Sequence, residues 1–330
     1  MADRPVIFSG IQPTGRKHLG NFIGAIRQYV EGQDRGDPAI YCVVDLHSIS
    51  VPYDPGDLRE RVLDTAAIIL AAGLDPERCI FFRQSDVREH TELTWFLSAV
   101  TAHGDLDRMT QFKEKTGSAR ELASAALFYY PVLMAADVLA YRATEVPVGE
   151  DQSQHVELMR EIARRFNARF GDTLVVPELV LPEVGARIMD LQEPERKMST
   201  TGGTPQGTVL VLDDEKTIRK KVGSAVTDSG REVRAAADKP GVTNLIDILA
   251  VARGTGRAEI ERQFDGAGYG DFKKAVADGV VDLLGPVRER YEELRPDEAA
   301  LEAILADGAE KAREIAAATM VDVRAKMGFA

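Results

Sequence analysis

Glycine and polar residues are concentrated between Gly10 and Asn21, where the chain reads GIQPTGRKHLGN. An apolar stretch precedes this segment and a helical pattern follows it, so backbone N–H groups and the helix dipole could bind phosphate there. Gly20 and Gly24 lie within the helical pattern, where a glycine costs about 1 kcal/mol relative to alanine. We interpret them as a helix surface kept bare for a bulky ligand such as a nucleotide. A tight strand–helix turn without a ligand is the alternative, since the segment matches neither GxGxxG nor GxxxxGK[ST].

A lysine, Lys197, lies in the polar, glycine-rich stretch QEPERKMSTTGGTPQGT that begins at Gln192. The stretch lacks hydrophobic periodicity, which predicts an exposed, mobile loop. A lysine on such a loop can close over a polyphosphate and contact it mainly in the transition state, which raises the rate rather than ground-state affinity. A solvated surface lysine is the alternative.

Asp137 lies in the middle of the apolar segment YPVLMAADVLAY, residues 130–141. Burial of an unpaired carboxylate costs several kcal/mol, so this side chain needs a partner. An arginine or a backbone amide could pair with it structurally. Alternatively, an acceptor-only group in an apolar pocket suits a substrate with one donor on an aromatic body. His47 follows the apolar stretch AIYCVVDL, beyond which Rossmann-type ligands bind, although a purely structural histidine explains it equally well.

The composition restricts the class of protein. The chain is 44% hydrophobic and 28% charged, as in ordinary globular proteins. No apolar run reaches the ~18 residues that span a bilayer, and no secretory signal begins the chain, so we expect a cytoplasmic enzyme without a membrane partner. The two cysteines lie in apolar runs and the five histidines lack ligand spacing, which predicts no metal site.

The net charge of −12 argues against a DNA-binding protein or a general nucleic-acid binder. A tRNA partner needs only a local basic face. Candidates for such a face are Lys216, Arg219, Lys220, Lys221, Arg231 and Arg234, with a solvated helix surface as the alternative.

Strand-like and helix-like segments alternate in the first half of the chain. Residues 6–10, 39–46 and 79–83 are apolar runs typical of strands buried on both faces, and 144–149 is a short extended segment. Helical patterns follow the first strand and Asp54-Pro55, and further helices are expected to open at Pro131 and to be capped by Asp151. This order predicts an α/β fold with a Rossmann-type parallel sheet.

The second half is predicted to be helical, over residues 213–226, 243–253, 257–264, 270–284 and 297–327. We therefore divide the chain into an α/β domain (1–191), the loop with Lys197 (192–207) and an all-helical domain (208–330). We expect the last helix to pack back on the first domain. Trp95, with Phe96 and Leu97, is assigned to the core or to a dimer interface.

HLGN at the first helix and KMSTT in the loop resemble the paired HIGH and KMSKS motifs of class I aminoacyl-tRNA synthetases. Three longer stretches narrow the resemblance to the tryptophanyl-tRNA synthetase family: MTQFKEK (109–115), YPVLMAADVLAY (130–141) and VPVGEDQSQHVELMREIA (146–163). SGIQPTG, VGARIMDL (184–191) and VGSAVTDS (222–229) match that family as well, so the resemblance runs from about residue 6 to residue 328.

The resemblance implies a role for each matching position. The ATP-binding residues would be Gln12, Pro13, Thr14, His18, Gly20, Asn21, Gly149, Glu150, Asp151, Ile188, Lys197, Met198, Ser199, Thr200 and Thr201. Those that bind tryptophan would be Asp137, which accepts a hydrogen bond from the indole N–H, His47, Tyr130, Met134 and Gln152. Thr200 stands where KMSKS has a second lysine, so Lys113 and Lys115, or Arg196, would supply the missing charge beside the catalytic Lys197.

The activity implied by the resemblance has two steps. L-tryptophan would attack the α-phosphate of ATP·Mg²⁺, without a dedicated protein site for the metal, and the adenylate would then pass its acyl group to tRNA(Trp). The helical domain would read the anticodon, and the family resemblance implies a homodimer. Three alternatives stay open: a tyrosyl-tRNA synthetase, a paralogue that binds tryptophan without charging tRNA, and a simpler nucleotidyltransferase.

Overall fold

The computed structural model of the chain describes residues 4–110, 124–181, 187–200 and 202–329. Five short strands form one sheet in the order β3-β2-β1-β4-β5, with every neighbouring pair parallel. They are β1 (Ile7–Ile11), β2 (Ala39–Val43), β3 (Ile80–Arg83), β4 (Glu145–Pro147) and β5 (Glu178–Val180). The predicted Rossmann-type α/β fold is confirmed, and β5 is one strand more than the sequence predicted.

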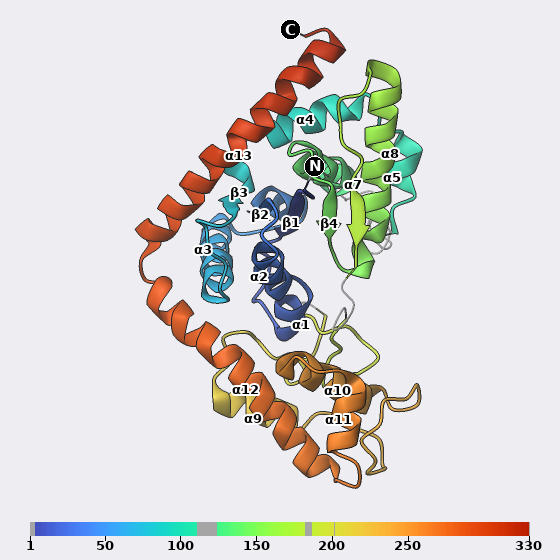
Figure 1. Cartoon of the computed structure of the whole chain (residues 1–330), viewed down its shortest axis with the longest axis vertical. Coiled ribbons are helices and arrows are strands. Elements are labelled where there is room, and N and C mark those ends of the chain that lie inside the picture. The colour runs from blue at the N-terminus through green and yellow to red at the C-terminus, as the bar shows by residue number, and fades with distance from the viewer. Residues whose placement is uncertain (1–3, 111–123, 182–186, 201, 330) are drawn as a thin grey trace.

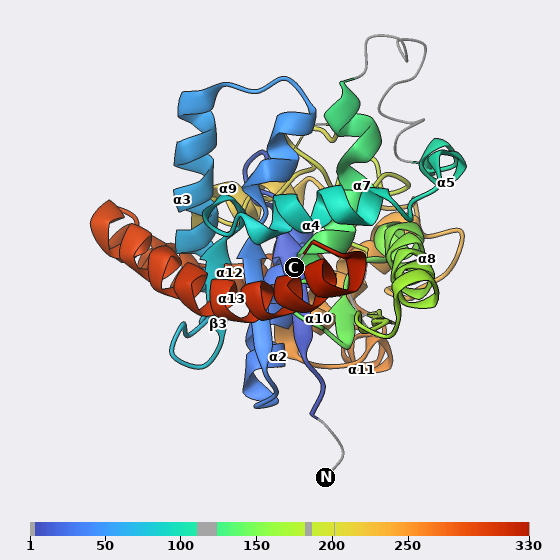
Figure 2. The ribbon, with the colours of Figure 1, turned by 90° about the horizontal axis from the view of Figure 1, so that it is seen from above.

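Helices cover both faces of the sheet (Figures 1 and 2). In the first half they are α1 (Leu19–Asn21), α2 (Arg27–Asp34), α3 (Pro55–Ala71), α4 (Glu89–Ser98), α5 (His103–Asp107), α7 (Ala125–Leu139) and α8 (Ser153–Phe170). A π-helical turn, η1 (Phe22–Ile26), joins α1 to α2. Short 3₁₀ turns are η2 (Asp45–Ser50), η3 (Gln84–Asp86) and η5 (Glu150–Gln152).

Successive strand residues point to opposite faces, which creates two cores. Ile7, Tyr41 and Phe81 pack on one face with residues of α3 and of the helices beyond Gly207. Phe8, Cys42 and Phe82 pack on the other face with α4, α7 and α8. Burial on both faces explains why these strands read as continuous apolar runs.

The second half contains α9 (Glu215–Gly223), α10 (Pro240–Arg253), α11 (Arg257–Gln263), α12 (Tyr269–Leu294) and α13 (Glu298–Met327). Figure 1 shows α9 to α11 gathered at one end of the molecule, while α12 and α13 run back along its side. Helix α13 lies against β3, and its Ala309, Ala312 and Ala316 belong to the core that contains Phe82. In the described part of the chain, no helix is long and apolar enough to cross a membrane.

Two helix starts differ from the prediction. Helix α7 begins at Ala125, where the Ser124 side chain accepts from the Leu127 N–H, and Pro131 lies inside the helix rather than at its start. Helix α8 begins at Ser153 after the turn η5, and Asp151 provides no cap because its carboxylate bonds Lys197 and Gln152. The Asp54 cap of α3 is confirmed, since its side chain accepts from the Asp57 N–H.

Candidate active site

The direction of strand order reverses between β1 and β4, because the chain proceeds from β1 to β2 and β3 on one side and reaches β4 and β5 on the other. Ligands of open parallel sheets bind at such a switch point, beyond the carboxyl ends of the strands. A cavity of about 490 Å³ lies there, lined by Gly10–Gln12 at the carboxyl end of β1 and by Val146–Gly149 at the carboxyl end of β4. The Ser9 hydroxyl donates to the Pro147 carbonyl at 3.0 Å and ties the two strands together beneath the cavity.

His18 opens the first helix and lines this cavity. Its Nδ1 accepts from the Asn21 N–H at 3.3 Å, while the Asn21 side chain accepts from the His18 N–H at 3.1 Å. Burial, together with the nearby charges of Lys17 and Lys197, lowers the pKa of His18 to about 4. The imidazole is therefore neutral near pH 7, and because Nδ1 accepts, Nε2 carries the proton and can donate to a ligand.

The two helix glycines differ in their surroundings. A Cβ at Gly20 would lie 3.1 Å from the His18 ring and 3.6 Å from the Ile188 Cβ, so glycine allows these two side chains to approach. A Cβ at Gly24 would meet nothing within 4 Å, and both glycines line the cavity. The helix surface is therefore bare toward the cavity, as a flat ring system would require.

Asp137 is only 2% exposed and lines the inner part of the cavity. Its Oδ1 accepts from Gln84 Nε2 and His90 Nδ1, both at 2.6 Å. Its Oδ2 accepts from His47 Nε2 at 2.7 Å. Burial alone would raise the pKa of Asp137, but the hydrogen bonds from His47 and His90 outweigh it and hold the pKa below its ordinary value. Since each carboxylate oxygen accepts about two bonds, Oδ2 retains room for one further donor from the cavity.

The predicted amino-acid residues surround this carboxylate. His47, Tyr130, Met134 and Gln152 all line the same cavity. The Tyr130 hydroxyl lies 2.7 Å from His155 Nε2, and burial raises the pKa of Tyr130 to about 12, so the phenol stays neutral. The rings of His47 and Tyr130 meet edge to face with centroids 6.1 Å apart. The Asp137 carboxylate therefore lies at a part of the cavity that is aromatic and largely apolar.

The loop with Lys197 lies over the mouth of the cavity. Lys197 Nζ is 3.2 Å from Asp151 Oδ1, and both side chains are about half exposed, at 48% and 51%. Met198, by contrast, is buried, because the chain at Met189 pairs with Lys197 as an antiparallel bridge and the Met198 N–H donates to the Ile188 carbonyl at 3.0 Å. The loop is thus exposed only in part.

Asp190, which the sequence reasoning did not identify, anchors the two ends of this loop. The side chain is fully buried and accepts from the backbone N–H groups of Gln192 and Thr204 at 2.8 and 2.9 Å. A Cβ at Gly207 would collide with its carboxylate, so glycine is required there. No spacing in the sequence marks this contact, because its partners lie up to 14 residues away.

The other predicted residues take different positions. Asn21, Gly149, Ile188 and Ser199 line the cavity, whereas Pro13, Thr14, Glu150 and Thr200 do not. The Thr200 hydroxyl lies 2.7 Å from the place that a Cβ of Gly15 would occupy, so this residue packs against the first motif. Lys113, Lys115 and Thr201 lie outside the described residues.

Two further side chains around Asp137 were missed. Gln84 is fully buried, and its Oε1 accepts from the Leu46 N–H at 3.0 Å, which turns its Nε2 toward Asp137. His90 is fully buried, and its Nε2 lies 2.6 Å from the Tyr141 hydroxyl. Only the preceding strand β3 could have suggested Gln84, since polar residues after buried strands often face a site.

Two cations of the predicted basic face form ion pairs with carboxylates of the same chain. Arg219 bonds Glu215 and Asp278, and Lys221 bonds Asp213 and the Thr208 carbonyl. Lys216 and Lys220 are exposed on the same helix. Within the part of the chain that the structure describes, no group of three or more His, Cys, Asp or Glu side chains could hold a metal ion.

Comparison with known proteins places residues 2–285 in the family described as tRNA synthetases class I (W and Y). The tryptophan–tRNA ligase 2 of Streptomyces avermitilis is 50% identical over 331 residues, 99% of this chain and 98% of that protein. The tryptophan–tRNA ligase of Oceanobacillus iheyensis is 48% identical over 98% of both chains.

Solved structures agree with these relatives. The tryptophanyl-tRNA synthetase of Mycoplasma pneumoniae superimposes with a TM-score of 0.92 at 32% identity, over 99% of this chain and 98% of that one. The Campylobacter jejuni enzyme, solved with ADP and tryptophan, has a TM-score of 0.79 at 35% identity, over 98% and 99% of the two chains.

Proposed function

The chain belongs to the class I tRNA synthetases for tryptophan and tyrosine, and on this premise we propose that it activates L-tryptophan with ATP and joins it to tRNA(Trp). As a member of this family it is an aminoacyl-tRNA ligase. The relatives of similar length that share about half of its residues are named tryptophan–tRNA ligases, which favours tryptophan over tyrosine.

One observation carries the assignment of the amino acid: the free acceptor position on Asp137 Oδ2 inside an aromatic chamber. Tryptophan has a single side-chain donor, the indole N–H, on a large apolar body. The His47 and Gln84 bonds hold the carboxylate in place before the substrate arrives, so the substrate does not have to order it. Tyr130 and Gln152, which line the same cavity, would meet the α-ammonium group.

The nucleotide would lie across the switch point. Gly20 and Gly24 leave space for the adenine beside Ile188, and Gly149 with Asp151 would hold the ribose. His18 Nε2–H and Lys197 would contact the phosphates. Lys197 would then exchange its Asp151 contact for the phosphate, so that its charge acts as the transition state forms.

The chemistry follows from this placement. A carboxylate oxygen of tryptophan would form a bond to the α-phosphorus while the bond to the bridging oxygen breaks, which releases pyrophosphate. A ribose hydroxyl of the terminal adenosine of tRNA would then attack the acyl carbon, and AMP would leave. Neither step needs a side-chain nucleophile, since positioning and charge stabilisation supply the rate. Mg²⁺ would enter as part of the ATP substrate.

The remaining partners are proposals as well. The helices α9 to α13 would contact tRNA, with Lys216 and Lys220 as exposed cations on α9. A homodimer is consistent with Trp95, which is 74% exposed on α4 and therefore not part of the core. Light scattering of the wild-type chain and of Trp95→Ser checks this assembly.

ATP–pyrophosphate exchange with each standard amino acid in turn tests the function. We expect exchange that depends on tryptophan, followed by aminoacylation of tRNA(Trp). Exchange that depends on tyrosine would identify the tyrosyl enzyme instead. Exchange with tryptophan but no charged tRNA would identify a paralogue that activates tryptophan for another purpose.

A further inference from the structure

Lys17 is a buried cation within the first motif whose role is not accounted for by the active-site cavity. It is 5% exposed, and its Nζ donates to the Gln12 carbonyl at 2.6 Å and to the Thr14 carbonyl at 3.3 Å. Within the described ranges it forms no ion pair with a carboxylate. The ammonium therefore stabilises the turn at residues 12–15 by direct hydrogen bonds to its backbone.

The shorter bond holds the carbonyl of Gln12, which lines the active-site cavity and precedes Pro13, a residue without an N–H. The longer bond holds the carbonyl of Thr14. The peptide unit between Thr14 and Gly15 is trans, so its N–H points opposite to its carbonyl. A carbonyl held by Lys17 thus directs the Gly15 N–H away from the ammonium, and this N–H donates to no acceptor in the described part of the chain. Gly15 has a φ of +62°, a left-handed conformation that makes such a turn possible.

The backbone of Lys17 is itself anchored. Its carbonyl accepts from the Val211 N–H at 2.9 Å, and the Leu19 N–H donates to the Val209 carbonyl at 2.8 Å. These bonds form an antiparallel bridge between His18 and Leu210. The lysine side chain can therefore act as a brace, because both its base and its ammonium are held.

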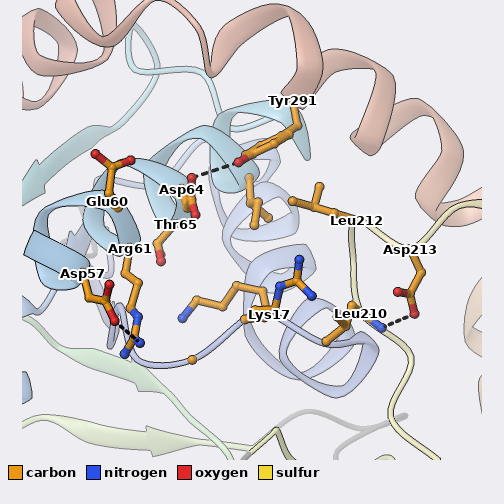
Figure 3. A pocket seen from close by; sticks show the side chains of 13 residues that line it. Lys17, Asp57, Glu60, Arg61, Asp64, Thr65, Leu210, Leu212, Asp213 and Tyr291 are labelled. Atoms are coloured by element: carbon orange, nitrogen blue, oxygen red, sulfur yellow. Dashed lines mark hydrogen bonds and ion pairs between the residues drawn. The ribbon is translucent and has the colours of Figure 1, made fainter. Parts of the chain in front are cut away.

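Lys17 lines a second cavity, of about 410 Å³, bounded by α3, α12 and the segment at Leu210–Asp213. Figure 3 shows its side chain extending into this cavity. The acidic side chains there have other partners: Asp57 bonds Arg61 at 3.0 Å, Asp64 bonds the Tyr291 hydroxyl at 2.9 Å, and Asp213 accepts from the Leu210 N–H at 2.9 Å. Lys17 lines this cavity and not the active-site cavity. Lys17 can therefore influence the binding of ATP only through the conformation of the turn at residues 12–15.

We propose that Lys17 is a positioning residue for adenylation, which holds the Gln12–Gly15 turn from the side of the second cavity and so keeps Gln12 in the place at the active-site cavity from which it contacts ATP. The inference rests on the proposed function for its substrate. It adds a contact that the active-site cavity alone does not reveal.

Binding of a non-hydrolysable ATP analogue, measured by calorimetry without amino acid, tests the brace. Lys17→Met removes the donors and keeps the length of the side chain, so we expect the Kd to rise roughly tenfold. Lys17→Arg keeps a donor, and the second cavity offers room for it, so affinity should return to within about threefold of wild type. Lys274→Met, an exposed lysine on α12, is the matched control and should bind as wild type does.

A pH series gives a readout that a merely structural lysine would not produce. Burial, together with the charge of Arg61, lowers the pKa of Lys17 to about 8, against a smaller opposing effect of Asp64. Loss of its proton weakens two charge-assisted bonds, so wild-type affinity for the analogue should decrease as the pH rises through 8. Lys17→Arg stays charged and should show no such decrease. The other charged and titratable groups around the ammonium are Arg16, His18, Asp57, Glu60, Asp213 and Tyr291, and they are unchanged in this comparison.

Nucleotide affinity within twofold of wild type in Lys17→Met would overturn the proposal, and so would identical pH profiles for the wild type and Lys17→Arg. The second comparison remains decisive if Lys17→Met does not fold. Tryptophan-dependent exchange by the wild type is measured in parallel. Its absence would contradict the proposed function, while weaker analogue binding in Lys17→Met would still support the brace.

Discussion

Asp137 illustrates how one side chain combines a structural and a recognition role. Three donors, from His47, Gln84 and His90, already bond it, so removal of the carboxylate would leave buried polar groups without a partner. Such a loss costs several kcal/mol. A test of recognition therefore needs a substitution that preserves shape, and asparagine fits better than alanine.

For Asp137→Asn we expect loss of discrimination between tryptophan and phenylalanine. A site built to bond its substrate's donor can reject an analogue without that donor by ~10⁴-fold. The measurement is kcat/KM for activation of both amino acids. Asp45→Asn is the control, since Asp45 is also buried and bonded, to Ser85 at 2.6 Å, but does not line the cavity. An unchanged ratio in Asp137→Asn would remove this residue from recognition.

The burial of Lys17 leads to a second prediction at the residue scale, on how the free energy of unfolding depends on pH. Its pKa is about 8 in the folded chain against 10.5 for an ordinary lysine, so the unfolded chain binds more protons between these values. Stability contributed by this residue therefore rises with pH from about 8 to 10.5, and the penalty of the buried charge is fully present below 8. The difference of about 2.5 units corresponds to on the order of 3 kcal/mol.

Urea unfolding of wild type and Lys17→Met across this range checks the sign. The difference in unfolding free energy should move in favour of wild type as the pH rises, because groups common to both chains cancel. A difference independent of pH would mean that Lys17 keeps its ordinary pKa.

At the scale of elements, the loop at 192–207 is held at its ends and at the buried Met198, while Lys197 is half exposed. Asp190 holds the backbone of Gln192 and Thr204, whereas Lys197 bonds the half-exposed carboxylate of Asp151. A surface ion pair of this kind contributes at most about 1 kcal/mol, so the lysine can leave Asp151 at little cost. The loop thus combines a fixed base with a cation that can change partner.

We expect Lys197→Ala to lower the rate of adenylation by ~10²–10³-fold, the usual scale for one lost electrostatic contact at a transition state. Tryptophan affinity in the absence of ATP should be unaffected, because Lys197 lies at the mouth of the cavity. Single-turnover kinetics and calorimetry give the two values. Lys274→Ala, which removes an exposed cation of α12, is the control. Equal losses of rate and tryptophan affinity would assign Lys197 a structural role.

At the scale of the whole molecule, α13 packs against β3, which is far from it in the sequence. It packs on β3 across Gly308, where a Cβ would collide with the Phe81 backbone. Its Leu301 and Leu305 belong to one core and its Ala309 and Ala312 to the other. The helix therefore closes the edge of the sheet beside both cores.

Gly308→Ala should lower the free energy of unfolding by roughly 1–3 kcal/mol, because overpacking forces the helix away from the sheet. The matched control is Gly285→Ala in α12, where a Cβ meets nothing within 4 Å. Alanine there should stabilise the chain by up to about 1 kcal/mol through helix propensity. Chemical denaturation of both variants tests the contrast, and equal stabilities would show that α13 accommodates the extra methyl group.

The sequence by itself determined the elements that depend on neighbours along the chain. Apolar runs predicted β1, β2 and β3, and alternation with helices predicted the parallel sheet. Asp54 marked the start of α3 through a contact three residues away. Helix α12 was predicted to end at residue 284 but continues to Leu294 through Pro286, because packing on α3 outweighs the local cost of proline.

Only the tertiary structure decided which of these residues meet. Asp137 was recognised as a buried carboxylate, but its partners Gln84 and His90 lie 53 and 47 residues away and carry no local signal. Lys17 bonds carbonyls that are only five and three residues away, but its burial depends on α3, α12 and the segment at Leu210–Asp213. Local patterns record the propensity of a segment, whereas the contacts of a site depend on strand order and register, which bring distant residues to the same edge of the sheet.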